Sequence, residues 1–271
     1  MSIVSSPTRA VAPRARRANA RASPRRAVVV DARRGRKKTS RELDRADAVD
    51  DDAMTTDDAP ALARVGRDDV LRSCATTSIG MLVVGLGARA ASGAFPTRAT
   101  HGDWNAALPL LGDDAGATAV AALCAAGAVT VGRIALLQVW DEFAASTDRS
   151  NAQVLGALDG AGDVAQVAVL PALGEEVLFR GALLPAVGGV PGVVVSSLVF
   201  GALHIGGGRS AAFGVWASAV GAVYGVAALH THSVAAPAAA HALANIASAV
   251  YWNATRAEKV IGEKEWEGED Q

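Results

Sequence analysis

The sequence is poor in the residues that build and cover an ordinary soluble domain. Of its 271 residues only 4% are aromatic and 20% are charged, although 51% are apolar. Soluble domains carry about 25% charged residues. Between positions 150 and 252 there are only six charges, too few to cover a soluble domain of that length. This shortage argues against a soluble enzyme, a disulfide scaffold and a nucleic-acid-binding domain, and it favours a membrane domain in contact with a lipid bilayer.

Cysteine is also scarce. Cys74 and Cys124 both lie in apolar runs and have no metal-ligand spacing. We therefore expect both to be small buried hydrophobic residues, with no disulfide or metal role.

The N-terminal segment lacks acidic residues. Residues 1–30 contain seven arginines and no Asp or Glu, and they have no apolar run long enough for a secretory signal. This composition predicts an organelle transit peptide over 1–35, with a basic arm that binds nucleic acid or anionic lipid as the alternative. Residues 36–70 lack apolar periodicity and predict a disordered charged linker.

Long uncharged runs follow the linker. They occupy 73–88, 115–132, 164–174, 181–208 and 210–255. Since a membrane span needs about 20 residues, the last run fits two spans, near 211–229 and 234–252, divided by His230-Thr-His232-Ser. The sequence predicts an all-α, polytopic transmembrane bundle with about six to seven spans. A soluble Ala-rich helical bundle is the alternative.

The predicted domain order follows from these runs. N-terminal membrane helices are expected over 71–149 and a polar-site core over 150–252. A polar acidic tail is expected over 253–271. Pro185 and the Gly188-Gly189 pair should break a helix before a span near 191–206.

Ionisable residues inside membrane helices are costly, so they are candidates for function. Glu176 and Arg180 are four residues apart, with the acid first, which favours a helical ion pair. Glu175 projects about 100° away and has no local cation, so it suits a general base. His204 follows Phe200 by four residues, as Asn245 follows His241.

Each of these features has a structural alternative. The ion pair could link helices, and a membrane His or Asn commonly hydrogen-bonds a neighbouring helix. Their concentration in one apolar stretch favours function. His230 and His232 are expected in a loop, and His101 is expected to be exposed.

The pattern Glu-Glu-x-x-x-Arg, Phe-x-x-x-His and His-x-x-x-Asn, with Gly174 and Gly181 flanking the first motif, resembles the CPBP family. This family includes type II CAAX prenyl proteases, bacteriocin-processing proteins and a plastid branch. The resemblance covers about 150–252. It implies an intramembrane endopeptidase acting on a membrane protein or peptide.

The resemblance also implies residue roles. Glu175 would activate water with help from His204, and His241 and Asn245 would stabilise the oxyanion. Glu176, Arg180 and Phe200 would shape the site. No cofactor is required. Zinc held by His204, His241 and a glutamate is the minority alternative, since there is no His-Glu-x-x-His motif. A plastid membrane scaffold or chaperone that does not cut its clients is the alternative function, and a transporter is a third.

The N-terminal composition gives a prediction about localisation. A fluorescent protein fused to residues 1–70 should enter the chloroplast, because the first 30 residues are Arg-rich and acid-free and the motifs resemble the plastid branch. Diffuse cytosolic or nuclear fluorescence would contradict this prediction.

Overall fold

The computed structural model describes residues 65–95 and 102–269, with side chains described up to residue 256. The predicted transit peptide, nearly all of the predicted linker and His101 lie outside the described residues.

The described part of the chain is helical and has no strand, which confirms the predicted all-α bundle. In chain order the helices are α2 (Arg67–Ala94), α3 (Trp104–Ala107), α4 (Ala115–Val139), α5 (Asp141–Val154), α6 (Ala161–Leu178), α7 (Leu184–Val187), α8 (Gly189–Leu203), α9 (Ala211–Thr231) and α10 (Ala235–Glu269). A 3-10 turn (Leu155–Ala157) precedes α6, and a π-helical turn (Phe179–Leu183) follows it.

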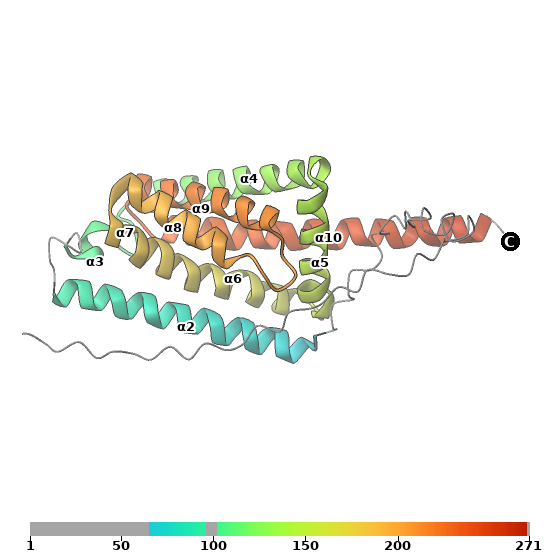
Figure 1. The fold of residues 1–271 in the computed structure, drawn as a ribbon, viewed down its shortest axis with the longest axis horizontal. Coiled ribbons are helices and arrows are strands. Elements are labelled where there is room, and N and C mark those ends of the chain that lie inside the picture. Colours follow the sequence, from blue (N-terminus) through green and yellow to red (C-terminus); the bar gives the residue numbers. More distant parts are fainter. Residues whose placement is uncertain (1–64, 96–101, 270–271) are drawn as a thin grey trace, which may run out of the picture. The chain divides into compact units, whose positions relative to one another are not determined.

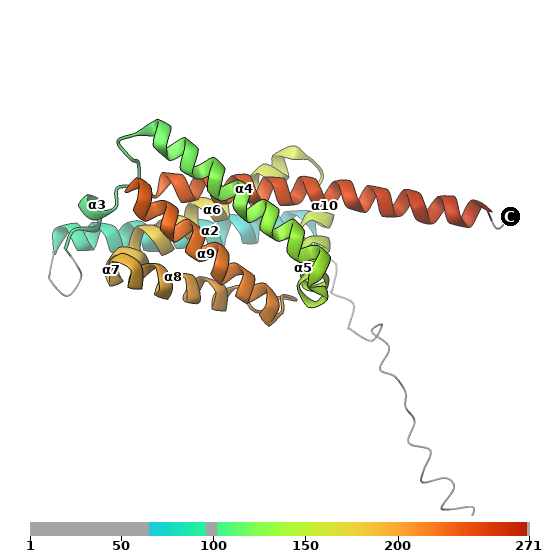
Figure 2. The same cartoon turned by 90° about the horizontal axis from the view of Figure 1, so that it is seen from above.

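The long helices are roughly aligned, and α5 crosses them near one end (Figure 1). Helix α6 packs between α2 and α10, while α10 also contacts α4 and α9. Seen from above, α9 lies between α8 and α4, and the second half of α10 extends past the other helices (Figure 2). Helices α6, α9 and α10 therefore form the centre, and α2, α4 and α8 lie around it.

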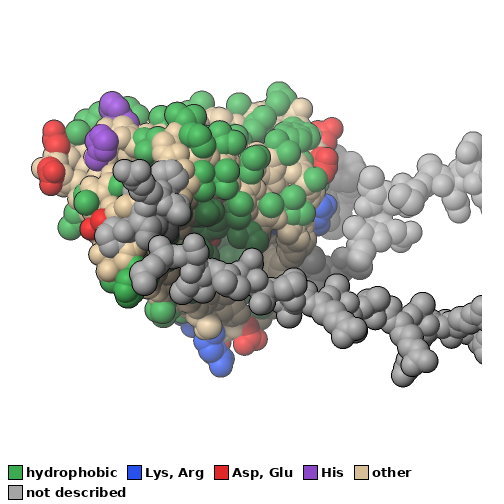
Figure 3. Space-filling model, turned by 60° about the vertical axis from the view of Figure 1, so that its left-hand side comes forward, with side chains coloured by type: hydrophobic (Ala, Val, Ile, Leu, Met, Phe, Trp, Pro, Cys, Tyr) green, Lys and Arg blue, Asp and Glu red, His purple; other side chains and the backbone are tan. Residues whose placement is uncertain are grey.

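The outer helices expose apolar side chains. On α2 these include Ile79, Val83 and Val84, and on α8 they include Val194 and Leu198. Figure 3 shows hydrophobic side chains over the middle of one face and charged side chains toward its margins. An exposed apolar surface of this extent fits contact with lipid.

This surface corrects one expectation about the cysteines. Cys124 is exposed on α4, and Cys74 is only partly buried on α2. A small apolar side chain on a membrane helix has no need to be buried in protein, because the lipid is as apolar as the core. The prediction that both thiols are buried was therefore wrong.

Three of the described helices are long and apolar enough to cross a membrane, namely α2, α4 and α9, and α8 is a shorter apolar helix. This is fewer than the six to seven spans expected. The other central helices are less apolar because they carry the polar residues: α6 contains Asp163, Glu175 and Glu176, and α10 contains His241 and Asn245.

The break expected between α6 and α8 is present. Pro185 lies in the first turn of the short α7, and Gly188 has a φ of 85°, a left-handed conformation that glycine adopts without strain. Helix α8 then begins at Gly189. The last two helices are separated as predicted, at His232, which is the left-handed C-terminal cap of α9. His230 lies in the last turn of α9 and not in the expected loop, because the helix continues to Thr231.

Helix α2 lies directly against the motif segment of α6. A side chain at Gly174 would collide with the backbone of Ser78, so this close approach requires glycine. Further along α2, Arg89 points inward rather than toward a lipid headgroup. Its Nη1 donates to the carbonyl of Gly181 at 2.6 Å, and its Nη2 donates to that of Leu108 at 2.9 Å. The α2 helix is thus fastened over α6 by packing and by a buried cation.

Candidate active site

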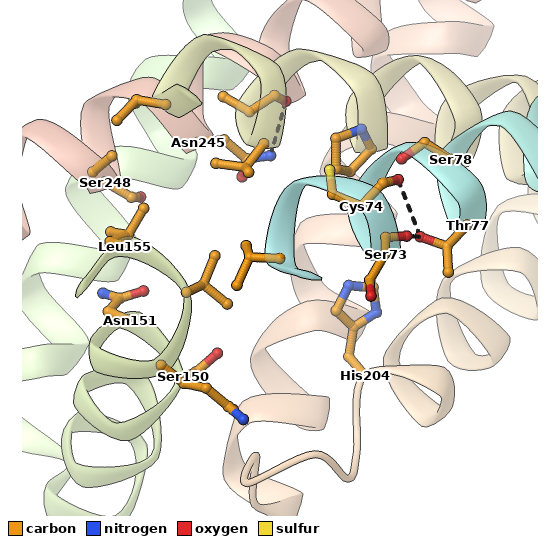
Figure 4. Close-up of a pocket in the computed structure, with 18 of the residues that line it drawn as sticks. Ser73, Cys74, Thr77, Ser78, Ser150, Asn151, Leu155, His204, Asn245 and Ser248 are labelled. Atoms are coloured by element: carbon orange, nitrogen blue, oxygen red, sulfur yellow. Dashed lines mark hydrogen bonds between the residues drawn. The ribbon is translucent and has the colours of Figure 1, made fainter. Parts of the chain in front are cut away.

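The four residues predicted to be catalytic line one cavity. Glu175 on α6, His204 at the end of α8, and His241 and Asn245 on α10 surround a space of about 460 Å³. Figure 4 shows His204 and Asn245 facing this space from different helices, with Ser73, Cys74 and Ser78 of α2 beside them. Residues up to 70 positions apart in the sequence thus converge.

The predicted ion pair is present and fully buried. Arg180 Nη1 donates to Glu176 Oε1 at 2.9 Å, and both side chains are 0% exposed. Arg180 Nη2 donates to the carbonyl of Gly221 at 2.9 Å, and the guanidinium lies 4.8 Å from the ring centre of Phe200. Glu176 and Arg180 are therefore held by α9 and by an aromatic wall.

Glu176 also fixes an imidazole. His241 Nδ1 lies 3.0 Å from Glu176 Oε1. Because a carboxylate only accepts, Nδ1 must carry the proton and donate it. The ring of His241 stacks on that of Tyr224, with centres 5.1 Å apart, which fixes its plane as well. In the neutral ring, Nε2 is then left with its lone pair facing the cavity.

His204, like His241, is held through its Nδ1 atom, but its partners are different. Its Nδ1 lies 2.7 Å from the carbonyl oxygen of Phe200, which can only accept, so this nitrogen also donates. The imidazole packs against the Phe200 ring, with centres 4.3 Å apart. The Phe-x-x-x-His spacing thus places both partners on one helical turn.

The two Nε2 atoms meet at Glu175. Glu175 Oε2 lies 4.0 Å from His204 Nε2 and 3.9 Å from His241 Nε2. This oxygen is buried and has no hydrogen-bond partner in the described part of the protein. The separations are too long for direct hydrogen bonds and fit bridging through one small molecule with protons to donate.

Asn245 belongs to the same cavity but is held differently. Its Nδ2 donates to the carbonyl of Ala168 at 3.3 Å, across the α6–α10 contact. One proton of the Asn245 amide is thereby used, and a second remains.

Residues 159–247 match the family model described as type II CAAX prenyl endopeptidase Rce1-like. This segment is similar to the Rce1-like family. The match agrees with the resemblance to the CPBP family, and it spans Glu175, Glu176, Arg180, His204, His241 and Asn245. No curated protein and no solved structure matches the chain. The family model is described as that of an endopeptidase.

Part of the cavity comes from outside the matched segment 159–247. Helices α2 and α5 contribute Ser73, Cys74, Ser78 and Asn151, among others. No motif in the sequence indicated this contribution. The only signal was the uncharged run 73–88, which predicted a helix but not its neighbour.

The π-helical turn was also missed. It widens the helix just after the two glutamates and contains Arg180 and Gly181. A π turn inserts one extra residue, and such turns are frequent at functional sites. Here it accompanies two buried cations, because Gly181 receives Arg89 and Arg180 reaches Glu176 and Gly221.

A second ion pair closes the end of the domain near α2. Arg67 Nε and Nη2 both donate to Asp163 at 2.6 Å, and the backbone N–H of Asp159 donates to the same carboxylate at 3.0 Å. These bonds stabilise the ionised form, so the Arg67 guanidinium holds the pKa of Asp163 below its usual range. The start of α2 is thus tied to the start of α6.

Within residues 65–95 and 102–269, no group of three or more His, Cys, Asp or Glu side chains is arranged to hold a metal ion. The donor types around Glu175 are nonetheless those that zinc accepts, because each imidazole presents Nε2 and Glu175 presents an oxygen.

Proposed function

We propose that the protein is an intramembrane endopeptidase that hydrolyses a peptide bond of a membrane-associated protein with a water molecule activated by Glu175 and His204. The observation that carries this proposal is the meeting of three proton-accepting atoms at one point of the cavity. They are Glu175 Oε2 and the Nε2 atoms of His204 and His241.

The protonation pattern favours water as the reacting molecule. Both imidazoles donate through Nδ1, so in their neutral forms each Nε2 accepts. A water molecule brings two protons and fits between atoms 3.9 and 4.0 Å apart. Glu175 takes one proton as the water attacks the carbonyl carbon, and His204 holds the other by accepting it in a hydrogen bond. Protonated Glu175 then passes the proton to the leaving amine.

The bond to Glu176 decides how His241 takes part. A neutral His241 has no N–H left for the developing oxyanion, because Nδ1 is bonded to Glu176. Its Nε2 is instead a second acceptor for the water proton that His204 holds. The oxyanion role expected for His241 is thus replaced by a role in positioning the water.

Asn245 supplies the oxyanion donor through its second amide proton. Asn245→Ala should lower kcat about 100- to 1000-fold, as for removal of one such donor in other proteases. The fold should survive, because the only hydrogen bond lost is the 3.3 Å bond to Ala168. Cleavage of a labelled peptide by purified protein in lipid nanodiscs measures this, and an unchanged kcat would remove Asn245 from the mechanism.

The metal-free form of the mechanism has its own test. Chelators should leave cleavage by the purified protein nearly unchanged, because Glu175 and His204 activate the water without a Lewis acid. Full loss of activity with a chelator, restored by zinc, would overturn the metal-free version and keep the endopeptidase.

The site of action we propose is a chloroplast membrane, thylakoid or inner envelope. The support is the Arg-rich, acid-free N-terminal segment together with the apolar helices of the domain. The substrates proposed are membrane proteins or their peptides, reached from the bilayer.

A further inference from the structure

Two arginines that belong to none of the motifs line the catalytic cavity. Arg133 lies on α4, and Arg209 lies in the turn between α8 and α9. Both are half-buried. The proposed peptide hydrolysis assigns neither of them a role.

Arg209 is positioned by a built turn. Gly206, Gly207 and Gly208 all have positive φ, between 58° and 115°, a conformation that side chains disfavour. The turn is closed by hydrogen bonds in both directions between the backbones of Gly206 and Arg209. It therefore reverses the chain directly after His204 and brings Arg209 back to the cavity.

Helix α5 and the start of α9 hold this arginine in place. Arg209 Nε donates to Ser150 Oγ at 3.0 Å, and the next backbone N–H, of Ser210, donates to Ser146 Oγ at 2.9 Å. The guanidinium lies 5.0 Å from the ring centre of Phe213. These contacts occupy Nε and one face and leave the two terminal nitrogens of the guanidinium free for another partner.

Neither arginine has an acidic partner. Arg133 makes no hydrogen bond or ion pair with another described residue, and Arg209 has no carboxylate close enough for an ion pair. The other buried arginines of the bundle differ in this respect. Arg180 is paired with Glu176, and Arg89 donates to two carbonyls. Burial lowers the pKa of Arg209, and the charge of Glu175 partly offsets this effect.

The acids in the cavity do not balance these two charges. Glu175 is used by the catalytic arrangement with both imidazoles. Asp69 also lines the cavity, but its side chain is 71% exposed and faces Arg72 at 4.0 Å. The charges that line the cavity therefore favour binding of a further negatively charged group. The cavity volume of about 460 Å³ lies in the range of ligand-binding sites.

We propose that Arg133 and Arg209 form a subsite that binds a carboxylate group of the peptide substrate beside the scissile bond. Guanidinium groups bind carboxylates through paired hydrogen bonds, and in a water-poor cavity such bonds discriminate strongly between charged and neutral groups. The inference rests on the proposed peptide hydrolysis, and it adds two specificity-determining residues to it: Arg133 and Arg209 select peptides that place a carboxylate group near the cleaved bond.

The test compares matched peptides on the full-length protein in nanodiscs of phosphatidylcholine. One pair differs by Glu against Gln at a single position, with an amidated C-terminus, and a second pair differs by a free against an amidated C-terminus. The wild type should prefer the charged member of at least one pair by roughly ten- to a hundredfold in kcat/KM. The pair that shows the preference identifies the source of the carboxylate.

The variants Arg133→Gln and Arg209→Gln should each bring this ratio close to one, whatever happens to the overall rate. Arg72→Gln is the matched control, since Arg72 is 76% exposed and lies outside the cavity lining, and its ratio should equal that of the wild type. Arg209→Lys keeps the positive charge but loses the paired N–H donors of the guanidinium, so it should retain part of the preference. A ratio near one in the wild type, or an unchanged ratio in both Gln variants, would overturn the subsite.

Binding separates this proposal from the proposed function. Fluorescence anisotropy of the same peptides on Glu175→Gln protein reads the subsite without hydrolysis. Arginine-dependent binding of charged peptides that the wild type never cleaves would support the subsite and count against the endopeptidase. If the Gln variants change only the binding of phosphatidylglycerol and not that of peptides, the arginines serve a lipid headgroup and the proposal is wrong.

Discussion

Replacing Glu175 by Gln should abolish peptide hydrolysis while leaving the fold and substrate binding intact. Gln keeps the shape and can still hydrogen-bond, but it cannot take a proton from water. The Oε2 atom of Glu175 has no protein hydrogen-bond partner, so no structural bond is broken. We expect kcat to fall by at least about 100-fold, because a general base usually contributes about 100- to 10,000-fold. The rate is measured with purified protein in nanodiscs.

The matched control is Glu142→Gln, the same chemical change at an exposed position on α5. Its kcat should equal that of the wild type, and both variants should melt at the wild-type temperature. Undiminished cleavage by Glu175→Gln would contradict the assignment of the base, even if the protein proved to be an endopeptidase.

Replacing Arg180 by Ala should be the most damaging single change to the fold. Removing one partner of a buried ion pair costs about 3–5 kcal/mol in soluble proteins, because the other charge is left alone. Here Glu176, at 0% exposure, would lose its guanidinium partner and keep only the imidazole of His241, and the carbonyl of Gly221 would lose its side-chain donor. A clear fall in the melting temperature of the detergent-solubilised protein is expected.

Two comparisons make this prediction specific. Arg149→Ala, at an exposed position on α5, should leave the melting temperature unchanged. The double variant Glu176→Ala/Arg180→Ala should be less destabilised than the sum of the two single changes, as expected for partners in contact. Equal melting temperatures for the wild type and Arg180→Ala would refute the structural importance of the pair.

The site's convergence could be predicted because each of its features is local. The spacing of four residues between Glu176 and Arg180 places an acid and a base on one helical face, and the structure has them 2.9 Å apart. The same spacing connects His204 to the carbonyl of Phe200. Polar groups in apolar helices had to find one another, because lipid offers them no partners.

What could not be predicted depends on tertiary contacts. Nothing in its local sequence indicates that Arg89 donates to Gly181 across a helix contact. The π turn lies where that contact and the Arg180 pair meet. Likewise, Arg133 lies 76 positions from Arg209, and only the packing of α4, α5 and α9 brings both to one cavity.

Helix length and hydropathy identify fewer spans than the uncharged runs do, for a related reason. The runs predict six to seven spans, but α8 is only 15 residues long and α6 carries three acids. A helix that faces a polar cavity on one side does not need to be apolar all round, so hydropathy alone does not separate the central helices from soluble ones.

The central claim is that Glu175 makes this protein cut other membrane proteins. The most direct measurement compares the N-termini of proteins in organelle membranes that contain either the wild type or Glu175→Gln at equal abundance. New internal N-termini from membrane proteins should be present with the wild type and lost with Glu175→Gln, and the uncut clients should co-purify with the variant. Identical N-termini in both membranes, with a wild-type phenotype in the Glu175→Gln cells, would contradict the claim and favour a scaffold that binds its clients without cutting them.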